Sequence, residues 1–229
     1  MFIFKLENMF TKKSMLLIIL IPIAVFIVIS LQITHEPEKH NEIVPTTQII
    51  NESEGNQIFW KKDRPLTWDD FKAIPDGKPI ETAQTNTALT YKSSFQINTL
   101  PPCTYQINWA KGIAYVNKSQ SWVKEGYGND PHLLEHEQRH FDMVEIHVRE
   151  FNKKFANELL NKPFPCPNDS TESLNSSVDK EVNKRLKKIF DDVVTLWLKM
   201  NEDYENQTIH GTDYEKQQEW NNKIDKLLE

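Results

Sequence analysis

The chain has 229 residues, of which 38% are hydrophobic, and its 33 acidic and 27 basic residues give a formal net charge of −6. This length allows one or two domains, and the hydrophobic share is enough for one ordinary core. A mildly acidic chain without long lysine or arginine runs lacks the electrostatic pattern of a nucleic-acid-binding protein, so no nucleic-acid partner is expected.

The N-terminal segment gives the clearest signal for localisation. The 19 residues from Met15 to Ile33 carry no charge, and about 20 apolar residues are needed for a helix to span a bilayer. Lys12 and Lys13 precede this stretch and Glu36 follows it. The positive-inside rule therefore keeps residues 1–14 in the cytoplasm and places the rest of the chain outside, behind a single-pass anchor over residues 15–33.

A cleaved signal peptide is the alternative interpretation, and it would give a secreted protein. A cleavage site needs small residues two positions apart, and after the apolar stretch only Ser30 is suitable, because Gln32 is a poor partner for it. In both cases the remainder of the chain lies outside the cytoplasm, where disulfides persist. Cys103 and Cys166 both lie in proline-flanked loop sequences, so we expect them to be bridged.

Residues 34–57 are polar and weakly periodic, which is typical of a linker, and residues 58–229 form the predicted domain. Early in this domain, Thr67 is the expected N-cap of a short helical turn that Pro75 ends. Alternating patterns then predict strands at residues 85–97, 104–110 and 112–118, with Lys111 and Gly112 as a turn. The first half is therefore predicted to be an antiparallel meander.

Helical periodicity begins near Pro131 and continues to Asn161, where a proline-rich stretch interrupts it. A second long helix is predicted within residues 170–206, and a final helix from about residue 212 to the C-terminus. Strands followed by long helices indicate an α+β fold. The apolar residues at helical spacing in the second helix are Val182, Leu186, Ile189, Val193, Leu196 and Met200.

The most informative motif is H-E-Q-R-H, which places His136, Glu137 and His140 within the first long helix. Histidines four residues apart lie about 6 Å apart along a helix axis on one face, which suits two nitrogen ligands of one Zn²⁺. Glu137, one step round, can reach a zinc-bound water and take its proton as it attacks a carbonyl. The motif therefore predicts two zinc ligands and a general base.

The helical geometry also assigns roles to the neighbouring residues. Asp142 points about 160° away from the two histidines and is expected to brace the back of the helix. His147 is on the correct face but lies about 10 Å further along the axis, so we expect it to pack or to face solvent. His132 is one turn before His136 and is expected at the surface. Two ligands do not complete a zinc site, so a third must come from another element.

These residues belong to a larger pattern. The stretches "PLTWDDF", "SWV", "LLEHEQRHFD" and "TIHGTDYEKQQEW" occur in this order between Ile58 and Trp220. In this the chain resembles a bacterial domain family of unknown function that is described as predicted secreted zinc-dependent proteases. The resemblance implies a zincin-like metalloprotease fold, and its most specific element is H-E-Q-x-H-F-D.

The resemblance implies roles for individual residues. His136 and His140 match the ligand histidines and Glu137 the catalytic glutamate. The T-x-H-G motif falls on residues 208–211, which makes His210 the implied third ligand, with carboxylates as alternatives that also complete such sites. Two tyrosines beside His210 are candidates for stabilising an oxyanion. The alternative ligands are Glu202, Glu205 and Asp213, and the two tyrosines are Tyr204 and Tyr214.

Motif, periodicity and resemblance together predict a membrane-anchored zinc metallopeptidase that cuts peptide or protein substrates outside the cytoplasm. Its mechanism would use a water activated by Glu137 on zinc, without a covalent intermediate. The alternative is a non-catalytic binding domain of the cell envelope in which the metal is structural or lost. A closed site with four protein ligands would favour that alternative, and three ligands would favour the enzyme.

Overall fold

The computed structural model describes residues 55–77, 79, 81–168 and 173–229. All of these belong to the second of two units into which the chain divides, Pro45–Glu229. The predicted membrane anchor (15–33) and most of the predicted linker (34–57) lie outside the described residues. Within the described part, no helix is long and apolar enough to cross a bilayer.

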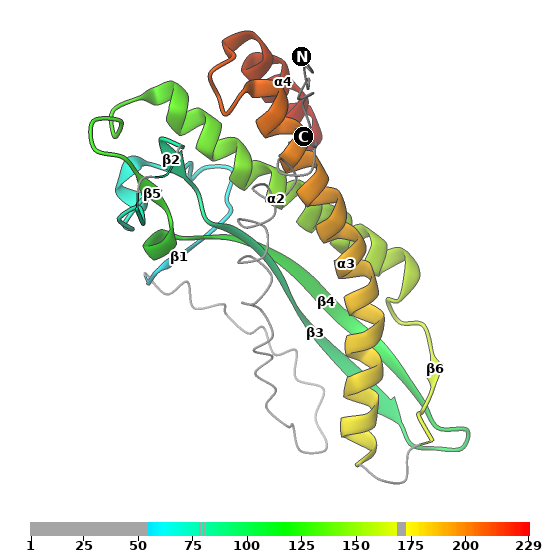
Figure 1. Ribbon diagram of the computed structural model, residues 1–229. Coiled ribbons are helices and arrows are strands. Elements are labelled where there is room, and N and C mark those ends of the chain that lie inside the picture. Colours follow the sequence, from blue (N-terminus) through cyan, green and yellow to red (C-terminus); the bar gives the residue numbers. More distant parts are fainter. Residues whose placement is uncertain (1–54, 78, 80, 169–172) are drawn as a thin grey trace, which may run out of the picture. The chain divides into compact units, whose positions relative to one another are not determined.

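The described residues form an α+β fold, as predicted, with a small antiparallel sheet and three α-helices (Figure 1). Strands β3 (Thr87–Asn98) and β4 (Thr104–Asn117) form a long hairpin. Two short strands, β1 (Gln57–Phe59) and β6 (Phe164–Pro165), pair with opposite ends of β4. A separate two-stranded ribbon consists of β2 (Ala83–Gln84) and β5 (Trp122–Val123).

Strand β4 runs without interruption through Lys111 and Gly112, so the predicted turn there is wrong, and the first half is mainly a hairpin. Gly112 pairs with Tyr91 of β3. A Cβ atom on Gly112 would lie 3.2 Å from side-chain atoms of both Phe151 and Val148 in the helix packed above. The glycine is therefore needed for close approach of the helix to the strand, which is a common reason for glycine inside a strand.

The short helix η1 (Trp68–Asp70) begins after Thr67, as predicted, but ends before Pro75. Its start is fixed by Asp70, whose Oδ2 accepts the backbone N–H of Thr67 at 2.9 Å. From Lys72 onward the backbone forms hydrogen bonds with other segments of the chain. The N–H of Lys72 donates to the carbonyl of Lys118 at 3.0 Å. These long-range hydrogen bonds hold the chain extended where local sequence favoured one more helical turn.

Three helices follow the strands: α2 (Pro131–Glu158), α3 (Leu174–Thr208) and α4 (Tyr214–Leu228). Each begins after a side chain that accepts a backbone N–H of the first turn, and these N-caps are Asp130, Ser173 and Asp213. Helices α2 and α3 pack against each other and against one face of the β3–β4 hairpin (Figure 1). This packing brings α3 beside the turns of α2 that carry the histidine motif.

The buried stripe of α3 follows the apolar residues at helical spacing over its first half and departs from them in the second. Val182, Leu186, Ile189 and Val193 are buried, but Leu196, although it is at helical spacing, is 48% exposed. After Val193 the stripe continues through Trp197, Met200 and Tyr204, at spacings of four, three and four. That spacing keeps the stripe on one face of the helix, whereas Leu196 falls to its side.

The predicted disulfide is confirmed: Cys103 and Cys166 are bridged, with a Cα–Cα distance of 5.5 Å. The backbone N–H of Cys166 also donates to the carbonyl of Cys103 at 3.1 Å. The bridge lies beside the pairing of β6 with β4 and links the segment after α2 to the tip of the hairpin.

Candidate metal site

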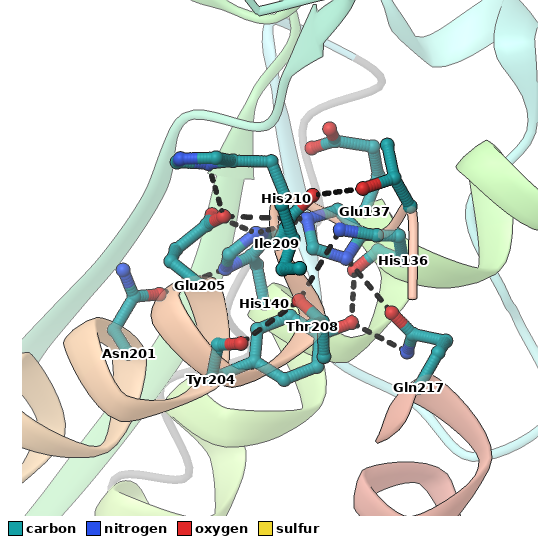
Figure 2. Close-up of polar contacts among 12 residues, drawn as sticks. His136, Glu137, His140, Asn201, Tyr204, Glu205, Thr208, Ile209, His210 and Gln217 are labelled. Carbon is teal, nitrogen blue, oxygen red and sulfur yellow. Dashed lines mark hydrogen bonds and ion pairs between the residues drawn. The ribbon is translucent and has the colours of Figure 1, made fainter. Parts of the chain in front are cut away.

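The two motif histidines are buried on adjacent turns of α2, as the spacing predicts. His136 and His140 are 3% and 8% exposed, and their Nε2 atoms lie 3.3 Å apart. Both rings turn toward α3 (Figure 2). The helix therefore presents two nitrogen atoms to one point in space.

Helix α3 supplies a carboxylate at that point. Glu205 Oε1 lies 2.8 Å from His140 Nε2, and its Oε2 lies 3.7 Å from His136 Nε2. The ligand atoms of these three residues all lie within 4.8 Å of one another, so the group can hold a metal ion. Two imidazoles and one carboxylate are a donor set known from catalytic zinc sites.

The second nitrogen of each histidine ring is held by an amide. His136 Nδ1 lies 2.9 Å from Gln217 Oε1 of α4, and His140 Nδ1 lies 2.7 Å from Asn201 Oδ1 of α3 (Figure 2). Because an amide oxygen only accepts, both Nδ1 atoms must carry the proton. These contacts leave both Nε2 atoms facing Glu205, which is the orientation that outer hydrogen bonds give metal-binding histidines.

The carboxylate also fits a metal ligand. Oε2 of Glu205 is buried and faces two imidazole nitrogens, His210 Nδ1 at 2.7 Å and His136 Nε2 at 3.7 Å. A buried anionic oxygen needs positive charge beside it, which a bound cation or a protonated ring can supply. Burial acts to raise the pKa of Glu205, but the imidazoles of His140 and His136 hold it far below the usual range of a carboxyl. The group thus favours negative charge on Glu205.

The same ion pair raises the pKa of His140, whereas it lowers the pKa of Glu205. Burial acts to lower the pKa of His140, but the nearby Glu205 carboxylate raises it to about 9. In the metal-free chain, a proton therefore supplies positive charge between His140 and Glu205. A divalent cation bound by the same atoms would supply that charge instead.

Tyr204 supports the site from behind. Its ring stacks on that of His136, with centroids 4.8 Å apart. Its hydroxyl donates to the backbone carbonyl of His136 at 3.2 Å and accepts from Gln217 Nε2 at 2.7 Å. Burial raises the pKa of this phenol. Because the hydroxyl is enclosed and fully engaged, Tyr204 does not fit the role of oxyanion stabiliser.

The second tyrosine also points elsewhere. Tyr214 is exposed, and its ring stacks on His132, with centroids 3.8 Å apart. His132 is thus more than a surface histidine, because its Nε2 also lies 2.7 Å from the carbonyl oxygen of Gly211. The pair joins the start of α2 to the loop that follows α3.

Glu137 is buried but is not among the three grouped donors, as its place on the helix predicts. Its Oε2 accepts a hydrogen bond from Thr85 Oγ1 at 2.5 Å. Thr85 lies between β2 and β3, far from Glu137 in sequence. Thr85 therefore holds the carboxylate of Glu137, which lies outside the group of three donors but is close enough to help raise the pKa of His140.

His210, the implied third ligand, lies at the mouth of the site. Its side chain is 63% exposed, and its Nδ1 lies 2.7 Å from Glu205 Oε2 (Figure 2). It is absent from the group within 4.8 Å. Of the alternatives, Glu202 is exposed and Asp213 caps α4 by accepting the N–H of Lys216. The carboxylate that the structure brings to the histidines is Glu205.

The T-x-H-G motif forms a tight loop in an unusual conformation. Ile209, His210 and Gly211 have consecutive positive φ angles of 51°, 53° and 78°. Such strain in a β-branched residue persists only when surrounding structure enforces it. Here the N–H of Gly211 donates to Thr208 Oγ1, and its carbonyl contacts His132. The loop thereby lays Gly211 against the ring of His136.

Asp142 and His147 lie where the helix geometry predicts. Asp142 braces the back of α2 and accepts hydrogen bonds from Trp60, Gln138 and Arg139. His147 is buried and donates through Nδ1 to the carbonyl of its own helix at Met143. Burial lowers its pKa. Neither residue takes part in the metal site.

Sequence reasoning missed the residues that support the site: Asn201, Gln217 and Thr85. Asn201 is one helical turn before Glu205, so the two residues share a helix face, and this spacing could have indicated that Asn201 lies at the site. Gln217 lies in the conspicuous "EKQQEW" stretch but without an indicated role. Thr85 has no local signal, because only the fold brings it to α2.

Comparison of the chain with known protein families, with curated proteins and with solved structures finds no match. The case for a function therefore rests on the motifs and on the geometry of the site.

Proposed function

We propose that this chain is a zinc-dependent peptidase with a zincin-like active site. One observation carries the proposal: His136, His140 and Glu205 converge from two helices, and the separate buried carboxylate of Glu137 is close enough to act electrostatically on His140. Three protein donors and a neighbouring general base are the components of metal-assisted hydrolysis.

The ion would be held by His136, His140 and Glu205. When bound, zinc supplies a Lewis acid that polarises a carbonyl and makes water more acidic. The choice of zinc rests on the donor set, since imidazole nitrogens with a single carboxylate suit this metal, whereas calcium and magnesium prefer oxygen ligands throughout.

Glu137 acts as the general base and then as the acid. Its carboxylate takes a proton from the water that attacks the peptide carbonyl carbon, and afterwards gives that proton to the leaving amine nitrogen. The C–N bond breaks, and no covalent bond forms between chain and substrate. Thr85 holds one oxygen of this carboxylate through a hydrogen bond, which leaves the other for the water.

The alternative, a binding domain with a structural metal, fits less well. Structural zinc sites almost always have four protein ligands, whereas the described group has three. His210 marks the side on which the group meets solvent, because its ring is exposed and contacts Glu205. That open side is where a substrate carbonyl would enter.

We further propose that the enzyme works outside the cytoplasm, behind the anchor predicted at residues 15–33. The Cys103–Cys166 bridge supports an oxidising compartment. The full-length chain, expressed in a bacterium, should stay in membranes after carbonate washing. A soluble mature form that begins near Ile33 would instead indicate a cleaved signal peptide.

The central experiment measures zinc content and cleavage of a mixed-peptide library by the full-length chain. Glu137→Gln should keep zinc but lose hydrolysis by about 10²–10⁴-fold, because only the base is removed. Glu135→Gln is the matched control, since Glu135 is on the same helix and, among the described residues, pairs with Arg139 at 3.7 Å, away from the metal site. Full activity in Glu137→Gln would reject the mechanism, and a zinc-loaded but inactive wild type would favour the binding domain.

A further inference from the structure

Thr85 makes the one side-chain hydrogen bond to Glu137 that is found among the described residues. Its Oγ1 lies 2.5 Å from Glu137 Oε2, and because a carboxylate can only accept, the hydroxyl donates. Thr85 and Glu137 are 8% and 3% exposed, so water does not compete for this contact. Threonine is branched at Cβ and has few rotamers, so its hydroxyl has a fixed direction.

The backbone on both sides of Thr85 is fixed by the S-W-V stretch. Gln84 pairs with Trp122 across the β2–β5 ribbon, and its Oε1 accepts from Trp122 Nε1 at 2.9 Å. Asn86 donates its N–H to Ser121 Oγ at 2.9 Å. Ser121 is completely buried. Thr85 is thus held between two anchored neighbours, and both anchors come from one dipeptide.

This arrangement holds the end of a long side chain in one direction. A glutamate has three rotatable bonds, and α2 fixes only its backbone, so the carboxylate of Glu137 can point in several directions. A hydrogen bond to one oxygen selects one of these directions and leaves the second oxygen free to accept from a water. A misplacement of about 1 Å at a reacting group is enough to cost about 10²-fold in rate.

We infer that Thr85 is a positioning residue for Glu137, and that Ser121 and Trp122 serve to aim it. The inference rests on the proposed function, since it gives Glu137 the role of general base. It also gives the S-W-V stretch, which precedes α2 and the histidines, a part in the same site.

The test compares three variants of the zinc-loaded full-length chain on a peptide substrate from the library. Thr85→Val keeps the shape of the side chain but removes the donor, and should lower kcat by about 10–100-fold with KM and zinc content unchanged. Thr85→Ser keeps the donor and should recover most of the rate. Thr87→Val is the matched control, because Thr87 is equally buried, at 9% exposed, but lies in β3.

A second measurement does not depend on activity. In the metal-free chain, Thr85→Val should lower the thermal unfolding midpoint because it leaves a buried carboxylate oxygen without its donor. In a Glu137→Ala background the same substitution should have little effect, since the acceptor is already gone. This non-additivity reports the contact itself.

The outcomes separate the inference from the proposed function. An active wild type with unchanged kcat in Thr85→Val would overturn the inference and leave the peptidase standing. Equal losses in Thr85→Val, Thr85→Ser and Thr87→Val would overturn it as well, because they would reflect packing alone. A wild type that cleaves no peptide would overturn the proposed function, and the catalytic role of Thr85 with it.

Discussion

Gly211 packs directly on a proposed zinc ligand, and substituting it should disturb the site from outside the ligand set. A Cβ atom at this position would lie 2.9 Å from both Cγ and Nδ1 of His136, and ordinary contacts begin near 3.4 Å. Gly211→Ala must therefore move the ring or the loop by about 0.5 Å, the difference between these two distances. Nδ1 is also the atom that Gln217 holds at 2.9 Å.

Two costs follow from the structure. The left-handed backbone, with φ of +78° at Gly211, costs an alanine about 1–2 kcal/mol of folding free energy. Displacement of the His136 ring from Gln217 should weaken zinc binding by about 10–100-fold, the usual effect of losing an outer hydrogen bond to a metal ligand. The first cost lowers the stability of the fold, and the second lowers the affinity of the site.

The assay separates these costs with a second glycine. Gly77 also has a positive φ, +68°, but a Cβ there would meet nothing within 4 Å. Gly77→Ala and Gly211→Ala should both lower the unfolding free energy of the metal-free chain in urea. Only Gly211→Ala should weaken zinc binding in competition with a chromophoric chelator. Equal zinc affinity in the two variants would refute the argument that Gly211 positions His136.

Three further predictions concern the ligands, the bridge and pH. Glu205→Gln should weaken zinc binding by orders of magnitude and His210→Ala by less than about tenfold, as measured by dialysis against a mild chelator; the reverse order would make His210 the ligand. Replacing both Cys103 and Cys166 by serine should cost about 4 kcal/mol of unfolding free energy on the chain-entropy model, given their separation of 63 residues; an unchanged urea midpoint would contradict this. Because folding raises the pKa of His140 from 6.5 to about 9, its stabilisation is complete below pH 6.5 and is lost as the pH rises through 9. The metal-free chain should lose on the order of 3 kcal/mol over that range, and a His140→Gln variant that lost as much would exclude this cause.

The sequence by itself determined much of the helical half and the first part of the site. Helical periodicity located the three long helices of the described residues, because each must bury an apolar stripe. The spacing of His136 and His140 predicted that both rings lie on one face of the helix, and the same helical geometry predicted Asp142 on the opposite face. These features are local, so a few neighbouring residues suffice to predict them.

Only the tertiary structure decided the rest, because it depends on contacts between distant segments. Gly112 has the sequence signature of a turn, yet it lies inside β4 because a helix packs against it. The identity of the third metal donor depends on which turn of α3 packs against the histidines of α2, and in the structure this turn carries Glu205. Thr85 reaches Glu137 across a separation of 52 residues. Periodicity predicts which face of a helix or strand is buried, but not which residues of other elements pack against that face. A metal site needs ligands from several elements, so its full set of donors depends on that packing.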